Sequence, residues 1–170
     1  QNKDCLGAGD VPVKIRINTP LTAFENDIAD VVRLFYGEGA ATTYDEICDG
    51  VLVHEHVLEH GVWSETFELT IGDASIKRSI SADACLDGGL EEKRQLKRLV
   101  KRCCYQLFKE HTGRTPAWGS LTGIRPTRLY YQQMENGKSR EQAREALAEL
   151  FDLSDEKLGL LDEIISAQEA

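Results

Sequence analysis

The chain has 170 residues, a formal net charge of −9 and 41% apolar residues. This length can bury a hydrophobic core of ordinary size, and the apolar content excludes an intrinsically disordered protein. A membrane-spanning helix is excluded because no apolar run approaches roughly 18 residues, and five cysteines at irregular spacing indicate reduced thiols in a cytoplasmic protein rather than a disulfide framework.

The first half of the chain predicts one sheet and one helix. Apolar and polar residues alternate in the segments 11–18, 50–57 and 63–71, as in strands with one buried face. Gly61 lies between the last two segments, which favours a hairpin, and Gly72 begins a second turn. The other expected elements are a helix at 21–36, a short strand at 40–46 and a strand at 74–80.

The longest predicted helix runs from about Leu90 to Glu110. Apolar residues repeat at helical spacing along one of its sides, which is the side expected to be buried. About half of its circumference, opposite this side, carries six cations in two exposed rows, one of lysines and one of arginines. These basic residues are Lys93, Lys97, Lys101, Arg94, Arg98 and Arg102.

Three short helices are predicted after residue 120. Pro126 suits the first turn of one, Ser139 with Gln142 forms a capping box for the next, and Ser154 caps the last. The order of elements predicts an α+β fold. We expect a body (residues 1–115) with an antiparallel sheet and two helices on one face, and then a small appendage of three helices (residues 116–170).

Charge is divided unevenly along the chain. Residues 93–131 contain ten Lys and Arg against one acid, Glu110, so this window carries +9 while the remaining residues carry −18. Such a division indicates a local surface that faces an anionic partner. The candidate partners are another domain, a nucleic acid and a carboxylated ligand. Trp118, Tyr130 and Tyr131 lie nearby and could stack bases. The alternative is a solvated helix face without a ligand.

Two histidines and two cysteines are candidates for metal or redox chemistry. His54 and His56 point to one face of a predicted strand and could begin a metal site, or form a solvent-facing pair on a half-exposed strand. Cys103 lies on the apolar side of the long helix and is expected to be buried, whereas Cys104 is expected to be more open. No cysteine lies at metal-finger spacing, so we assign no metal site and no catalytic residue.

The segment 118–128 (WGSLTGIRPTR) is a glycine-punctuated loop that leads into a helix. Backbone N–H groups of the Thr122-Gly123 turn, the helix dipole and the guanidinium groups of Arg125 and Arg128 would meet there, as in a carboxylate or phosphate site. In the alternative, Pro126 fixes the helix start, Arg125 pairs with an acid of the body and the loop packs the appendage.

Residues 116–165 resemble the N-terminal region of HemZ-type coproporphyrinogen dehydrogenases, which are oxygen-independent radical S-adenosylmethionine (SAM) enzymes. The resemblance lies in PAWGSLTGIRPTRL at 116–129, ENGKS at 135–139 and the helix that leads to LSDEK at 153–157. Its most specific part is LTGIRPTR at 121–128. The single methionine, Met134, lies inside the chain and predicts that the sequence is a piece of a longer protein.

The resemblance implies an accessory domain in front of a radical SAM barrel. In that family the barrel holds a [4Fe-4S] cluster on a CxxxCxxC motif, binds SAM and decarboxylates two porphyrinogen propionates oxidatively during haem synthesis. This chain has no such motif, so the resemblance implies no radical chemistry within it. The family's architecture gives Thr122, Gly123, Arg125 and Arg128 a role in docking the barrel or holding a substrate carboxylate.

The basic helix would then attract a carboxylated porphyrinogen or an acidic domain surface. The rival hypothesis is a non-catalytic nucleic-acid-binding module that uses the same helix. The −18 carried by the rest of the chain would confine such binding to one face.

Overall fold

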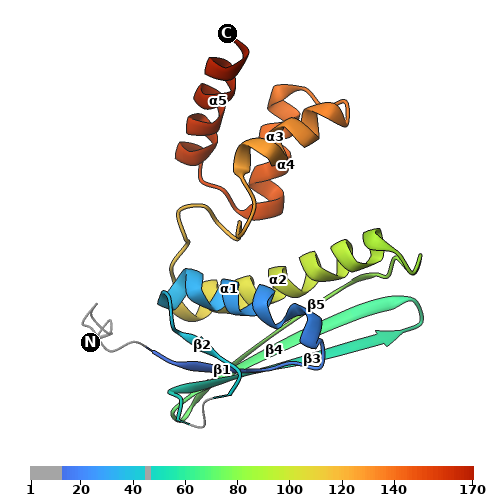
Figure 1. Cartoon of the computed structure of the whole chain (residues 1–170). Helices are drawn as coiled ribbons and strands as arrows, with labels where there is room; N and C mark the ends of the chain where they lie inside the picture. The colour runs from blue at the N-terminus through green and yellow to red at the C-terminus, as the bar shows by residue number, and fades with distance from the viewer. Residues whose placement is uncertain (1–12, 45–46) are drawn as a thin grey trace.

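A computed structural model describes residues 13–44 and 47–170. The chain forms two lobes (Figure 1). The body contains a sheet with two helices on one face, and the helical lobe contains the last three helices and lies above those two helices. This arrangement confirms the α+β fold and the two helices that share one face of the sheet.

The sheet has five strands in the order β2-β1-β3-β4-β5. Their bounds are β1 Ile15–Asn18, β2 Ala41–Thr42, β3 Gly50–Glu59, β4 Val62–Ile71 and β5 Ala74–Asp83. β3, β4 and β5 are antiparallel neighbours, as the turn signals predict, but β1 runs parallel to both β2 and β3. The expectation of a purely antiparallel sheet is therefore wrong. A helix returns the chain from the end of β1 to the start of β2, and such a crossover makes strands parallel.

The strand predicted at 11–18 is shorter in the structure, where β1 begins at Ile15. Val11 and Pro12 lie outside the described residues. Beyond β1, a 3-10 turn at Thr22–Phe24 leads into α1 (Glu25–Tyr36), and α2 (Leu90–Thr112) follows β5.

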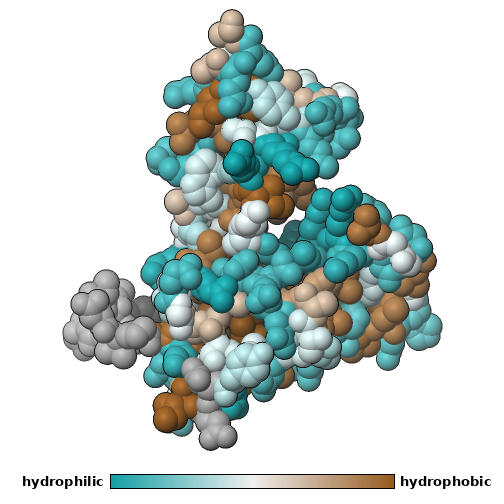
Figure 2. All heavy atoms as spheres, in the orientation of Figure 1, coloured by the Kyte–Doolittle hydropathy of each residue, from teal (hydrophilic) through white to brown (hydrophobic). Residues whose placement is uncertain are grey.

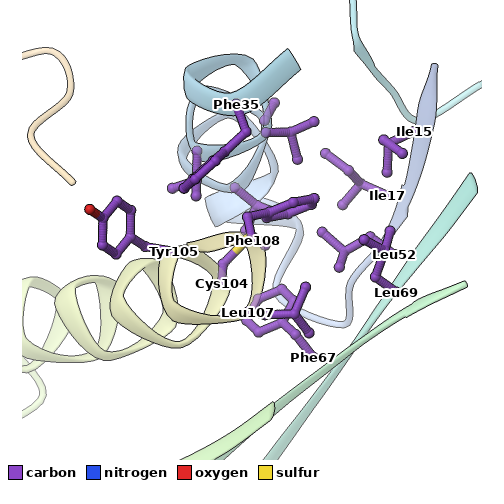
Figure 3. Packing of buried hydrophobic residues seen from close by; sticks show 14 of the residues in the cluster. Ile15, Ile17, Phe35, Leu52, Phe67, Leu69, Cys104, Tyr105, Leu107 and Phe108 are labelled. Atoms are coloured by element: carbon purple, nitrogen blue, oxygen red, sulfur yellow. The ribbon is translucent and has the colours of Figure 1, made fainter. Parts of the chain in front are cut away.

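The core of the body lies between these helices and the inner face of the sheet (Figure 3). Phe35 of α1 stacks on Phe108 of α2 with ring centroids 5.6 Å apart, and Tyr36 meets Phe108 edge to face. Residues that alternate along the strands complete the core, because period-two side chains share one face. They include Ile15, Ile17, Leu52, Phe67 and Leu69.

The helical lobe consists of α3 (Pro126–Glu135), α4 (Arg140–Phe151) and α5 (Asp155–Glu169) and has its own buried cluster. Both bonds of the predicted capping box at Ser139 and Gln142 are present, and the Ser154 hydroxyl accepts from the backbone N–H of Lys157. These N-caps begin α4 and α5 where the sequence predicts. The cluster comprises Leu121, Tyr130, Ala143, Leu147, Leu153, Leu158, Leu161 and Ile165.

Gly119 allows the loop before α3 to lie directly against the turn after α4. Its φ is +56°, and a Cβ built on it would lie 1.8 Å from the carbonyl oxygen of Phe151. The neighbouring Ser120 N–H donates to that same oxygen at 2.8 Å. Backbone touches backbone here, so no side chain can move aside to make room.

We predict that Gly119→Ala destabilises the protein by about 3 kcal/mol or more, because left-handed strain and a backbone clash add together. Gly113→Ala is the matched control, since Gly113 also has a positive φ (+66°) but open space around it. We expect it to cost only about 1 kcal/mol. Urea unfolding followed by circular dichroism measures both, and equal losses would show that the close approach at Gly119 contributes nothing.

Candidate functional site

The loop and the first turns of α3 form an open groove of about 860 Å³. Arg125 occupies the N-cap position with extended backbone, and Pro126 is the first helical residue, as predicted. The groove therefore follows one side of α3 from its start to its end. Its lining residues are Gly123, Ile124, Arg125, Thr127, Arg128, Tyr131, Gln132 and Glu135.

Arg125 and Arg128 are exposed, and neither has a hydrogen-bond or ion-pair partner among the described residues. Arg125 therefore pairs with no acid of the body among the described residues, contrary to that alternative. Gly123 has a φ of +69° and no atom close to the position of a Cβ. Two unneutralised guanidinium groups thus border a groove whose floor is partly apolar, because Ile124 remains half exposed.

Thr122 has a different role from the arginines that follow it. Its hydroxyl accepts a hydrogen bond from Nζ of Lys101 in α2, so it attaches the loop to the body. Burial lowers the pKa of Lys101, while the nearby carboxylates of Asp27 and Asp30 act in the opposite direction. Lys101 is therefore a contact within the protein and is less available to a ligand.

The predicted basic face of α2 divides into paired and unpaired cations. Lys97 lies 3.4 Å from Asp27 of α1, and Arg94 lies 3.9 Å from Glu91. The prediction that the lysine row is exposed is wrong for Lys97 and Lys101, which are half-buried because α1 and the loop lie beside them. The exposed cations of this face without a partner among the described residues are Lys93, Arg98 and Arg102.

Asp152 joins the helical lobe to the far end of α2. Its Oδ2 accepts from the Tyr105 hydroxyl at 2.8 Å and from Lys109 Nζ at 2.6 Å. Burial would raise the pKa of Asp152, but these two hydrogen bonds and the Lys109 charge lower it overall. The carboxylate therefore holds the lobes together above its unfolded-state pKa, and this contribution is lost as the pH falls through its lower folded-state value.

The nearby aromatic residues do not form an exposed stacking platform. Tyr130 is fully buried, its hydroxyl donates to Asp162 at 2.5 Å, and burial with this bond raises its pKa to about 12. Trp118 is half-buried and has Lys157 Nζ 5.4 Å from its ring centre. Of the three candidates, the half-buried Tyr131 lines the groove, and its hydroxyl lies 3.2 Å from the side-chain oxygen of Gln168.

The two strand histidines belong to a buried polar network. His54 is 3% exposed, so the expectation of a solvent-facing pair is wrong. Its Nε2 and the Nδ1 of His56 lie 2.8 and 2.7 Å from the two oxygens of Glu65, which is fully buried. Thr19 Oγ1 lies 2.8 Å from the other His54 nitrogen. Both imidazoles are thus hydrogen-bonded to one carboxylate.

Glu65 was not identified from the sequence, although a signal exists. It occupies an inward position of β4 between Trp63 and Phe67, directly opposite His56. A charged residue among buried apolar neighbours is costly unless it is paired. A search for its partner on the adjacent strand would have found the network.

The four cysteines that the structure describes are not grouped as ligands of a metal cluster. Cys103 and Cys104 are both fully buried, which confirms the expectation for Cys103 and contradicts it for Cys104. Burial raises the pKa of the Cys103 thiol to about 11 and that of Cys104 well above its usual value, so both thiols resist ionisation in this environment. In the described residues no three His, Cys, Asp or Glu side chains are placed to hold a metal ion.

Comparison with known proteins supports the resemblance found in the sequence. The chain is 40% identical over 78 residues to the oxygen-independent coproporphyrinogen-III oxidase-like protein HemZ of Bacillus subtilis (strain 168). The match covers 46% of this chain and 16% of that protein, so the chain spans a small part of its relative. No protein-family model and no solved structure matches the chain. None of the helices within residues 13–44 and 47–170 has the length and apolarity needed to cross a membrane.

We predict that Glu65→Ala destabilises the protein by about 3 to 5 kcal/mol, because the buried imidazole of His54 and the half-buried imidazole of His56 both lose their partner. Glu55→Ala is the control, since Glu55 is exposed on the adjacent strand and its loss should change stability by less than about 0.5 kcal/mol. Chemical denaturation of both variants tests the expectation. A Glu65 variant as stable as the parent chain would contradict it.

Cysteine reactivity should follow burial. In the folded protein at about pH 8, Cys48 and Cys85 are half-buried and should react with iodoacetamide much faster than Cys103 and Cys104. Cys103 and Cys104 should react more slowly because their raised pKa values keep both thiols protonated at this pH. Peptide mapping by mass spectrometry, with urea-unfolded protein as the control, measures each site. Equal labelling of all four in the folded state would refute the assignment.

Proposed function

We propose that this chain is the accessory domain of an enzyme similar to HemZ, and that it positions the catalytic part of that enzyme or an anionic substrate. The 40% identity to HemZ over 78 residues carries the proposal. The groove on α3 supports it independently, because a volume of about 860 Å³ suits a small ligand and the groove is bordered by two unpaired arginines.

The substrate that suits this groove is a carboxylated porphyrinogen. Ile124 and Tyr131 offer an apolar and aromatic surface to the pyrrole rings of the macrocycle, while Arg125 and Arg128 can each bind a carboxylate through paired N–H donors. The relative is named for coproporphyrinogen III, whose periphery bears such groups. We infer that the parent enzyme works in porphyrin or haem biosynthesis, as an oxidoreductase of the cytoplasm.

The radical chemistry of such an enzyme needs a [4Fe-4S] cluster and SAM, and the described residues do not fit the cluster. The sequence has no CxxxCxxC motif, the adjacent pair Cys103 and Cys104 is buried, and no three His, Cys, Asp or Glu side chains of the described residues are placed to hold a metal ion. The proposal therefore places catalysis in a radical SAM domain outside this chain. That domain is the first partner we propose, and the carboxylated porphyrinogen is the second.

A nucleic-acid-binding module is the weaker alternative. Lys97 pairs with Asp27, Lys101 bonds Thr122, and Tyr130 is buried. A surface that binds single-stranded nucleic acid needs a longer row of free cations and more exposed aromatic rings than α2 and its neighbours offer. A salt titration of RNA binding separates the two. Affinity that falls steeply with salt would favour the alternative.

We predict that Arg125→Ala with Arg128→Ala in the complete enzyme raises KM for coproporphyrinogen III about tenfold. The estimate allows about 0.7 kcal/mol for each charge-assisted contact, a low value because the groove is open to solvent. The control is Lys77→Ala with Arg78→Ala, which removes the same charge from two exposed positions on β5 that do not line the groove. Unchanged KM and unchanged domain packing would remove the role proposed for the two arginines.

The coding sequence after Ala170 provides a direct test of the parent enzyme. We expect a CxxxCxxC motif within a few dozen residues, because the radical SAM barrel should follow this region. Genome sequencing of the locus reads it directly, and its absence would contradict the proposed enzyme class.

A further inference from the structure

The sheet has two edges of very different length. β2 forms one edge with two residues, whereas β5 forms the other with ten. Figure 1 shows the helical lobe above α1 and α2, on the helix side of the sheet, and Figure 2 shows the same separation with all side chains drawn. The lobe therefore does not continue the sheet beyond β5. A long open edge is a template for pairing with another strand.

Alternate residues of β5 direct their backbone groups away from the sheet. Ile71 and Ala74 flank a two-residue turn, so Ala74 and every second residue after it exchange hydrogen bonds with β4. The residues between them turn their N–H and C=O groups outward. Among the described residues, none of these groups has a backbone hydrogen-bond partner outside the sheet. The outward residues are Ser75, Lys77, Ser79, Ser81 and Asp83, and all five are exposed.

Opposite charges lie toward the two ends of this open edge. Lys77 lies near its start and Asp83 at its end, with serines between them. The other cation of the strand, Arg78, lies on the opposite face of the sheet, where its Nη1 is 3.5 Å from the carboxylate of Glu110 in α2. An edge that begins basic and ends acidic is complementary to itself when two copies run antiparallel.

We propose that the open edge of β5 is an interface for a second copy of this chain, whose own β5 pairs with it antiparallel about a two-fold axis at Ile80. In this register Lys77 of each copy lies opposite Asp83 of the other, and Ser79 lies opposite Ser81. The outward N–H and C=O groups of these residues then bond to one another, and the two sheets become one continuous sheet. The inference does not depend on the proposed function.

The charges select this register over its neighbours. Outward backbone groups also meet when the axis moves by one residue, which slips the strands by two. An axis at Ser79 or Ser81 places Asp83 opposite a serine, and an axis at Arg78 brings two arginines together. Cross-strand pairs of opposite charge stabilise a sheet and like charges destabilise it, so the axis at Ile80 is favoured.

The test measures dimer formation of the 170-residue chain by sedimentation velocity over about a hundredfold range of concentration. We expect a reversible dimer for the parent chain, and a Kd at least about tenfold higher for Lys77→Asp and for Asp83→Lys, because symmetry converts two attractive pairs into two repulsive ones. Glu55→Lys is the matched control. It changes the charge as Asp83→Lys does, but at an exposed position of the central strand β3, and should change Kd less than about twofold.

An equal mixture of Lys77→Asp and Asp83→Lys is the decisive sample. In a mixed dimer of these two variants both cross-copy pairs again join opposite charges, so the mixture should regain the parent affinity within about threefold. Recovery also shows that both variants fold, which matters for Lys77→Asp because Glu68 lies opposite this position on β4. A mixture that associates no better than the single variants overturns the proposed pairing.

Ser79→Pro tests the backbone bonds of the edge separately. Proline removes one outward N–H and no bond to β4, so the variant should keep its circular dichroism spectrum and lose the dimer. A parent chain that stays monomeric throughout the concentration range overturns the inference, and so does a dimer that survives both the charge variants and Ser79→Pro. The mixture decides the question for a Ser79→Pro chain that does not fold.

Discussion

The structure depends on one helix that is held from three directions. The apolar side of α2 covers the sheet, its lysines reach Asp27 of α1 and Thr122 of the loop, and Tyr105 with Lys109 binds Asp152 of the helical lobe. Any rotation of α2 about its axis would break contacts on all three sides. The lysines and Tyr105 of α2 therefore fix the helix, and with it the positions of its arginines.

This constraint changes what the charge of the sequence means. The +9 window reads as one cationic surface, but the structure uses several of its charges internally, where they join α1, the loop and the helical lobe to α2. The cations of this window that have no partner among the described residues are fewer, and they lie along α2 (Lys93, Arg98, Arg102) and at the groove on α3 (Arg125, Arg128). Net charge by window predicted an anion-facing region, and only tertiary contacts distinguish the cations that are available to a ligand.

Local features were predicted well because their causes are local. Pro126 at the first turn of α3 and the capping pair Ser139–Gln142 are determined by residues a few positions apart, and both are found where expected. The parallel placement of β1 was missed because alternation identifies a buried face but not a neighbouring strand. For the same reason the pattern identified Arg125 and Arg128 but not Asp152 or Glu65, whose partners are distant in sequence. The division into domains at residue 115 remains a prediction.

The network around Glu65 also determines how β3 and β4 align during folding. Hydrophobic alternation forbids a slip of one residue, since it would turn the core face outward, but it tolerates a slip of two. A slip of two toward Leu58 would move Glu65 away from His54, and the buried carboxylate would lose that imidazole. The network thus penalises a misaligned hairpin that apolar packing alone would accept.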